Sequence, residues 1–320
     1  MALHAGAKSV KDEDRATAVM RPAQTQGAQA QLELAPDHLH LWRAEANVFR
    51  DVCAGSEAYS GMLLLLSEDE RERAERFRFS EPRERFVIGR GILRCILSRY
   101  VGVAPQELVF EVGSMGKPAL AGPASGLLHF NVAHTEDLLL ILVGRGLRRR
   151  GLDTRGGGSV GVDVERVRPL AGMARMTAML FEPEHRPQIE SLTQDARIRA
   201  ILTAWTLTEA LGKAAGDGLA DAVRWARLQV DPATGLPLTI QRCCDGKQCY
   251  WACSIALGTD HGDGHHRYGG RHHRYIGAVA VEGPVEGNGP AWHLQSGGRH
   301  HRYEITASDL LSAVSDSAHG

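Results

Sequence analysis

The stretch Gly161-Val162-Asp163-Val164-Glu165 predicts a β-strand with one apolar face and one acidic face. Side chains alternate along a strand, so Val162 and Val164 share one face, and Asp163 and Glu165 share the other. Two such carboxylates lie roughly 7 Å apart along the strand, and they repel each other unless a positive charge lies between them. Mg²⁺ prefers such oxygen ligands and often accompanies a phosphate. An ordinary half-buried strand has the same pattern, so other stretches must decide between the two interpretations.

Size and composition exclude several classes of protein. The chain has 320 residues, of which 43% are hydrophobic, enough for one or two domains with their own cores. The net charge is −1, so the overall charge does not point to nucleic acid. No apolar run reaches membrane-spanning length, and no secretory signal, Walker-type motif or Rossmann glycine motif occurs. We therefore expect a cytoplasmic protein that is neither an ATPase nor a dehydrogenase.

The order of the periodic segments predicts an α+β (α/β) fold of two similar halves. Amphipathic helices are expected over 86–100 and 198–215, and strands follow each of them. In the second half the expected strands cover 228–230, 238–240, 250–257 and 275–281. The predicted organisation is a disordered lead over 1–30, an N-terminal half over 31–150, a C-terminal half over 151–282 with a His- and Gly-rich insertion near 258–275, and a loosely structured tail over 283–320.

A second informative stretch lies in the later helix. Residues four apart share a helix face, so Trp205, Glu209 and Lys213 line up. A surface Glu–Lys pair explains this spacing, but so does a third carboxylate for a metal with a phosphate-binding lysine beyond it.

A third stretch joins a rigid turn to a strand end. Gly116-Lys117-Pro118 predicts a turn, and alternation along 130–135 buries Phe130 and Val132. His134 then lies near the strand end, where functional groups are often presented. A single histidine is usually an ordinary polar residue, but the nearby lysine favours a phosphate site.

The cysteines and a repeat in the last third are interpreted as structurally ordinary. The six cysteines contain no C-x-x-C pair, so we expect free thiols and not a disulfide framework or a zinc site. The sequence Gly-Gly-Arg-His-His-Arg-Tyr occurs at 269–275 and again at 297–303. We interpret it as low-complexity surface sequence, with weak metal binding as the alternative.

Taken in order, four motifs resemble the Sfp-type 4′-phosphopantetheinyl transferase family. They are G-K-P at 116–118, F-N-x-x-H-T at 130–135, G-x-D-x-E at 161–165 and W-T-x-x-E-A-x-x-K at 205–213, and the similarity runs from about Leu63 to Val281. The resemblance implies a pseudo-twofold pair of halves in one monomeric chain, with coenzyme A between them. It also implies Mg²⁺-dependent transfer of the phosphopantetheine arm of coenzyme A to a serine of an apo acyl- or peptidyl-carrier protein, with release of adenosine 3′,5′-bisphosphate.

The resemblance also assigns roles to individual residues. Asp163, Glu165 and Glu209 would hold Mg²⁺, and Glu209 is our hypothesis for the base that takes the serine proton. The phosphates of coenzyme A would be contacted by Arg85, Lys117, His134 and Lys213, and Thr135 would lie beside them. Arg73 is a weaker candidate for such a contact.

The chain departs from the family pattern at two positions. The family commonly has Ser where Ala133 stands and often has Lys where Thr208 stands, so we expect one hydroxyl contact and one charge beside the metal to be lost. The alternative function is a non-catalytic relative that binds coenzyme A or a carrier protein. The sequence does not identify the carrier.

Overall fold

A computed structural model describes most of the chain outside the N-terminal lead, two long insertions and the tail. The described residues are 32–34, 39–45, 57–113, 115–136, 138–145, 159–231, 233–238, 240–244, 248–257, 275–283 and 302–304. The predicted lead over 1–30, almost all of the insertion near 258–275 and most of the predicted tail lie outside these ranges.

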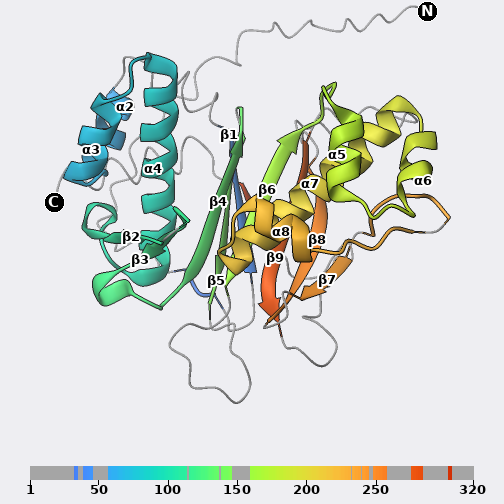
Figure 1. The fold of residues 1–320 in the computed structure, drawn as a ribbon. Helices are drawn as coiled ribbons and strands as arrows, with labels where there is room; N and C mark the ends of the chain where they lie inside the picture. The colour runs from blue at the N-terminus through green and yellow to red at the C-terminus, as the bar shows by residue number, and fades with distance from the viewer. Residues whose placement is uncertain are drawn as a thin grey trace, which may run out of the picture. The chain divides into compact units, whose positions relative to one another are not determined.

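Two four-stranded sheets form the framework of the described chain (Figure 1). The first has the order β10-β1-β5-β4, in which β1 and β10 are parallel and the other neighbours antiparallel. The second has the order β6-β9-β8-β7 and is antiparallel throughout. The strands span Leu39–Glu45 (β1), His129–Thr135 (β4), Leu138–Gly144 (β5), Val160–Arg166 (β6), Ile240–Cys244 (β7), Cys249–Leu257 (β8), Tyr275–Gly283 (β9) and Arg302–Glu304 (β10).

Helices accompany both sheets, which confirms the predicted α+β class. They are α2 (Glu57–Leu64), α3 (Glu68–Glu75), α4 (Ser80–Val101), α5 (Met173–Leu180), α6 (Arg186–Ser191), α7 (Gln194–Ala215) and α8 (Leu219–Trp225). A short hairpin of β2 (Phe110–Val112) and β3 (Pro118–Leu120) follows α4. None of the described helices combines the length and the apolar character that crossing a membrane requires.

Three apolar clusters arrange the elements in layers. Alternation along β5 divides its side chains, so Leu139 and Ile141 pack with α4, whereas Leu138 and Leu140 pack against the second sheet. Both 22-residue helices end at a glycine in the left-handed conformation, Gly102 after α4 and Gly216 after α7. Helix α7 covers the far face of the second sheet. The order of layers is therefore α4, first sheet, second sheet, α7.

Strand β6 has the two faces that its sequence predicts. Val160, Val162 and Val164 enter the apolar cluster between the sheets. The opposite face lies against α7, and Gly161 is the point of closest approach: a Cβ atom there would lie 2.0 Å from the carbonyl oxygen of Ala210. Only glycine leaves room for the helix backbone at this position.

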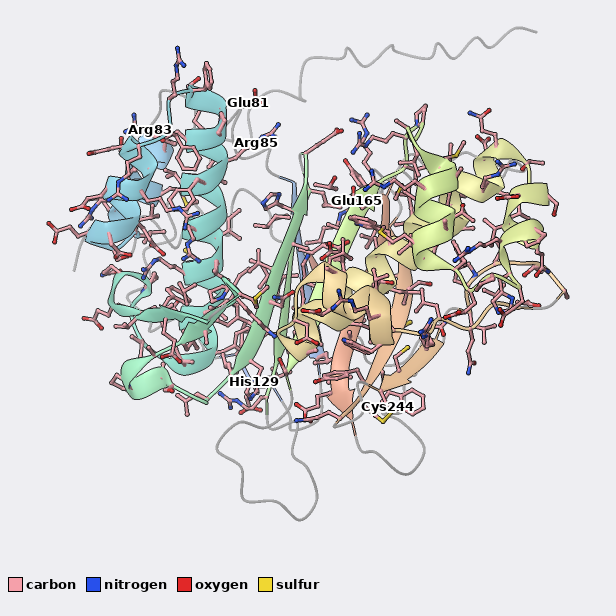
Figure 2. All side chains as sticks on the ribbon, in the orientation of Figure 1. Glu81, Arg83, Arg85, His129, Glu165 and Cys244 are labelled. Carbon is pink, nitrogen blue, oxygen red and sulfur yellow. A yellow bond between two sulfur atoms is a disulfide. The ribbon has the colours of Figure 1, made fainter. Side chains whose placement is uncertain are left out.

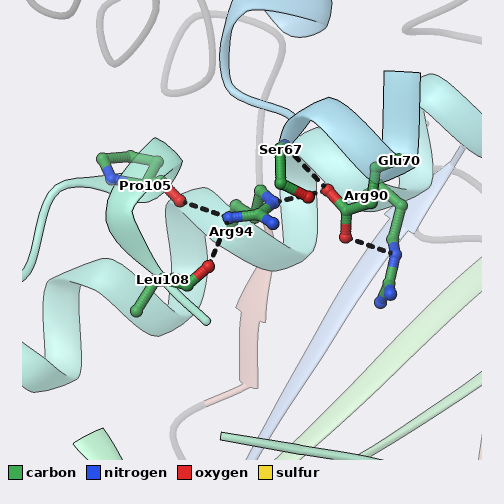
Figure 3. Close-up of polar contacts among 6 residues, drawn as sticks. All are labelled: Ser67, Glu70, Arg90, Arg94, Pro105 and Leu108. Carbon is green, nitrogen blue, oxygen red and sulfur yellow. Dashed lines mark hydrogen bonds and ion pairs between the residues drawn. The ribbon is translucent and has the colours of Figure 1, made fainter. Parts of the chain in front are cut away.

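A buried ionic network stabilises the N-terminal half (Figure 3). Glu70, the third residue of α3, forms a capping box with Ser67. Its carboxylate accepts from Arg94 Nε at 2.7 Å and pairs with Arg90 at 3.0 Å. Arg94 also donates to the carbonyl oxygens of Pro105 and Leu108. The charge of Arg94, 1% exposed, is thereby compensated, as a buried charge requires.

The structure corrects several sequence predictions outside the site. Cys244 and Cys249 form a disulfide that closes the β7–β8 hairpin, so the prediction of free thiols is wrong for this pair. Residues 228–230 form no named strand, and an isolated bridge joins Val230 to Pro237. Of the predicted strand over 238–240, Ile240 begins β7 and residue 239 lies outside the described residues. Within the predicted loose tail, β10 pairs with the edge of the first sheet.

Replacing Gly161 with alanine should destabilise the protein, because the new methyl group would overlap the backbone of α7. We expect a loss of about 1–3 kcal/mol or more in the free energy of unfolding, measured by urea denaturation. Gly89→Ala in α4 is the matched control, since the position of its new methyl group has no neighbouring atom within 4 Å beyond its own stretch of helix. It should be neutral or stabilising by up to about 1 kcal/mol. Equal effects of the two substitutions would contradict the close approach.

Candidate active site

The acidic face of β6 meets α7 at an ion pair. Lys213 Nζ donates to Asp163 Oδ1 at 2.7 Å. Asp163 is 7% exposed, and its second oxygen, Oδ2, is buried without a hydrogen-bond partner. Burial raises the pKa of the Asp163 carboxyl, and the neighbouring Lys213 opposes this rise. The pair therefore leaves one buried carboxylate oxygen available to a cation.

Glu165 on β6 and Glu209 on α7 are both half-buried, and the charges of Asp163 and Lys213 act on both. Burial is the main cause of a raised pKa at Glu165, and the charges of Asp163 and Glu209 add to it. The pKa of Glu209 is also raised by burial, with Asp163 adding to the rise and Lys213 opposing it. These acids repel one another, which is the condition that a bound cation would relieve.

The three acids do not form a finished metal site. In the part of the chain that the structure describes, no three His, Cys, Asp or Glu side chains are grouped as metal ligands. The residues nevertheless fit a hard divalent cation, because all three donors are carboxylates and Asp163 Oδ2 is an unpaired buried oxygen.

The N-terminal half contributes the end of β4. His134 is exposed, and its charge acts on Asp163. Thr135 is half-buried beside it, and Glu136 begins the turn to β5 with a φ of 44°. Glu136 forms an ion pair with Arg166 at the end of β6, so this turn is connected to the acidic strand.

Asn131 links the edge strands of the two sheets. Its side chain is 4% exposed, and its Oδ1 accepts a hydrogen bond from the backbone N–H of Val162 at 2.9 Å. Because Asp163 follows Val162, this bond fixes the acidic strand relative to β4. The motif at 130–135 contains Asn131 but predicts no role for it, since nothing in the local pattern identifies its partner.

The side chain of Lys117, which lies in the turn before β3, reaches the start of β6 and the end of α7. Its ammonium donates to Ser159 Oγ at 2.7 Å and to the carbonyl oxygens of Val160 and Lys213 at 2.9 Å and 2.6 Å. The predicted contact with a phosphate stays a prediction. A cavity of about 460 Å³ adjoins Lys117 and is also lined by His129, Phe130, Ser159 and Gly216.

The arginines predicted to contact phosphates lie on the helices of the N-terminal half. Arg85 extends from the first turns of α4, and Glu165 from the end of β6 (Figure 2). Arg85 pairs with Glu81 at 2.7 Å and is 44% exposed, so solvent reaches its guanidinium. Arg73 lies over the ring of Phe86, 5.1 Å from its centroid.

The two departures from the family pattern prove to be buried. Ala133 is 4% exposed and packs in the apolar cluster between the sheets. Thr208 is 2% exposed, and its hydroxyl donates to the carbonyl oxygen of Ala204 in its own helix. Both side chains therefore lie in the packed interior and not on the solvent-exposed surface.

Comparison with known proteins identifies similar chains. A model of the 4′-phosphopantetheinyl transferase superfamily matches residues 159–269, and one of the N-terminal part of 4′-phosphopantetheinyl transferases matches residues 54–145. The chain is 35% identical over 206 residues to the 4′-phosphopantetheinyl transferase HetI of Nostoc sp., covering 63% of this chain and 79% of that protein.

More distant relatives carry the same description. A phosphopantetheinyl transferase of Thraustochytrium sp. is 28% identical over 184 residues, covering 54% of this chain and 60% of that protein. A 4′-phosphopantetheinyl transferase of Bacillus subtilis is 26% identical over 170 residues, covering 53% of this chain and 68% of that protein.

The raised pKa values predict that the acids destabilise the metal-free protein at neutral pH. A carboxyl whose pKa is raised on folding binds its proton more tightly in the folded state, so stability falls as pH rises from the ordinary pKa through the raised one. Glu209→Gln removes one such group. We expect its melting temperature in EDTA at pH 7 to exceed that of the wild type by a few degrees, with the difference vanishing near pH 4.

The matched control is Glu184→Gln, at an exposed position in the turn before α6. It should leave the melting temperature unchanged at both pH values. A Glu209→Gln variant that is less stable than the wild type in EDTA at pH 7 would show that the acids do not repel one another.

Proposed function

This chain belongs to the 4′-phosphopantetheinyl transferase superfamily and transfers phosphopantetheine to carrier proteins, and we propose that the acidic face of β6 and the facing side of α7 are its reaction centre. The donor is coenzyme A and the acceptor is a serine of an apo acyl- or peptidyl-carrier protein. The observation that carries the proposal is the buried, unpartnered Oδ2 of Asp163 beside Lys213, with Glu165 and Glu209 around it.

Asp163, Glu165 and Glu209 would hold Mg²⁺, directly or through water. The cation would lower the repulsion between the attacking serine and the pyrophosphate and stabilise charge on the leaving phosphate. The support for this assignment is chemical, since three carboxylates with raised pKa values lose their mutual repulsion when a divalent cation is bound.

Cationic and polar side chains on both halves suit the phosphates of coenzyme A. Lys213 lies on α7 next to the acids, and its ammonium pairs with Asp163. If the ammonium paired with a phosphate oxygen in place of Asp163, its charge would still be compensated. His134 and Thr135 at the end of β4, and the solvent-accessible Arg85 on α4, are the contacts proposed from the N-terminal half. Phosphoryl transfer depends mainly on such positioning and electrostatics.

Glu209 is the proposed base for the serine proton. A general base works best when its pKa lies near the working pH. Burial moves the pKa of Glu209 in this direction. Its place on α7, four residues before Lys213, puts the base and the cation on one helix face.

The oligomeric state, the compartment and the carrier-binding surface are also proposals. The predicted organisation of two halves in one chain suits a monomer, and we propose that the reaction takes place in the cytoplasm because coenzyme A and carrier proteins are found there. The Cys244–Cys249 disulfide is unusual for that compartment, so the cysteines no longer support this location. The arginines over 71–90, most of which are exposed, are suited to an acidic carrier surface.

The direct test is a change in carrier mass. The purified protein is incubated with coenzyme A, Mg²⁺ and several apo carrier proteins, and the carriers are weighed by mass spectrometry. We expect at least one carrier to gain a single phosphopantetheine, and EDTA to block the gain. Glu209→Gln should reduce the rate by about 10²-fold or more while coenzyme A still binds, and Glu184→Gln should match the wild type.

Two outcomes would contradict the proposal at different points. If coenzyme A binds but no carrier gains mass, the protein is a non-catalytic relative. If Glu209→Gln retains the full rate, the transfer stands but Glu209 is not its base.

A further inference from the structure

The turn before β3 holds a lysine whose hydrogen bonds are all made within the protein. Lys117 Nζ lies 2.6–2.9 Å from three oxygens, those of Ser159 Oγ, Val160 O and Lys213 O. An ammonium has three N–H donors, so each donor has one acceptor and none is left for a phosphate. The ammonium of Lys117 therefore joins the turn before β3 to the segments that carry its three acceptors.

The three acceptors belong to the two elements that form the reaction centre. Ser159 and Val160 lead into β6, four residues or fewer before Asp163. The carbonyl of Lys213 lies in the last turn of α7, where helix carbonyls lack helical partners and carry partial negative charge. The ammonium of Lys117 thus binds the backbone of the same residue whose side chain pairs with Asp163.

We propose that Lys117 is a positioning residue for the transfer reaction, whose ammonium joins the β3 turn to β6 and α7 and thereby fixes Lys213 relative to Asp163. This inference rests on the proposed function, because it concerns the geometry of that site. It replaces the predicted phosphate contact of Lys117 with an indirect role.

The charge state of Lys117 agrees with this role. Burial lowers the pKa of Lys117 to about 8, and the carboxylate of Glu282 on β9 opposes the effect. At neutral pH the group therefore keeps its third proton, which the third acceptor requires. His129 on β4 is another titratable neighbour, and its pKa is lowered by burial and by the charge of Lys117.

The geometry distinguishes lysine from arginine. Three oxygens converge on one nitrogen atom, which suits a tetrahedral ammonium, whereas a planar guanidinium spreads its donors over three nitrogens. Lys117→Arg therefore keeps the positive charge but loses the arrangement, and Lys117→Met loses both. A phosphate contact would tolerate arginine, but the proposed cross-link would not.

The experiment measures kcat and KM for transfer to a carrier protein, and the dissociation constant of coenzyme A, in four single variants and one double variant. We expect Lys117→Met and Lys117→Arg each to lower kcat about tenfold or more while the dissociation constant changes less than about threefold. Arg85→Met, at a proposed direct contact, should instead weaken coenzyme A binding. Ser159→Ala removes one acceptor and should lower kcat more mildly, without additivity in the double variant with Lys117→Arg.

Each contrary result overturns a different statement. If Lys117→Arg restores coenzyme A affinity lost in Lys117→Met, while kcat at saturation is unchanged in both, Lys117 is a phosphate contact and the inference is wrong. If the Lys117 variants do not fold, an unchanged kcat in Ser159→Ala still rejects the inference. If the wild type transfers nothing in the same assay, the proposed function fails and this inference fails with it.

Discussion

The close approach of α7 to β6 is the constraint on which the rest of the site depends. The absence of a side chain at Gly161 lets the backbone of Ala210 lie against the strand, and the two elements share one of the largest interfaces in the described fold. With the helix at this distance, Lys213 reaches Asp163, and Glu209 faces the same acidic surface. A longer separation would break the ion pair and remove the third carboxylate from the other two. The packing at Gly161 therefore sets the geometry of the proposed reaction centre.

Polar contacts from the N-terminal half reach β6 at its start, middle and end. Lys117 binds the start of the strand, Asn131 accepts from the N–H of Val162, and Glu136 pairs with Arg166. The apolar cluster between the sheets stabilises their packing, but apolar contacts are not directional. Hydrogen bonds are directional, so these three contacts fix the register of the acidic strand against β4. The repulsion among the acids is a local cost of function that this framework has to withstand.

Local pattern predicted the parts of the structure that depend on periodicity. The alternation around Asp163 gave the correct faces of β6, and the spacing of four placed Glu209 and Lys213 on one side of α7. The partners of Lys117 and Asn131 could not be predicted, because they come from segments distant in sequence that only the folded chain brings together. The burial of Ala133 and Thr208 also depends on how the whole chain packs. The Cys244–Cys249 disulfide joins residues only five apart, and it was missed because the sequence does not show that they face each other across a hairpin. The motifs identified the candidate residues, but they did not predict the hydrogen bonds and ion pairs that hold these residues in place.

A crystal structure of the protein with coenzyme A and Mn²⁺ in place of Mg²⁺ would test the central claim most directly. Mn²⁺ can be located by its anomalous signal, so its position would not depend on interpretation of the surrounding density. We predict a metal ion bound through Asp163 Oδ2, with Glu165 and Glu209 as ligands at roughly 2.1 Å or through water, and with a pyrophosphate oxygen completing its coordination. Lys213 and His134 should contact the phosphates, and Lys117 should keep its three protein acceptors. A metal ion or a coenzyme A pyrophosphate bound away from β6 and α7 would contradict the account.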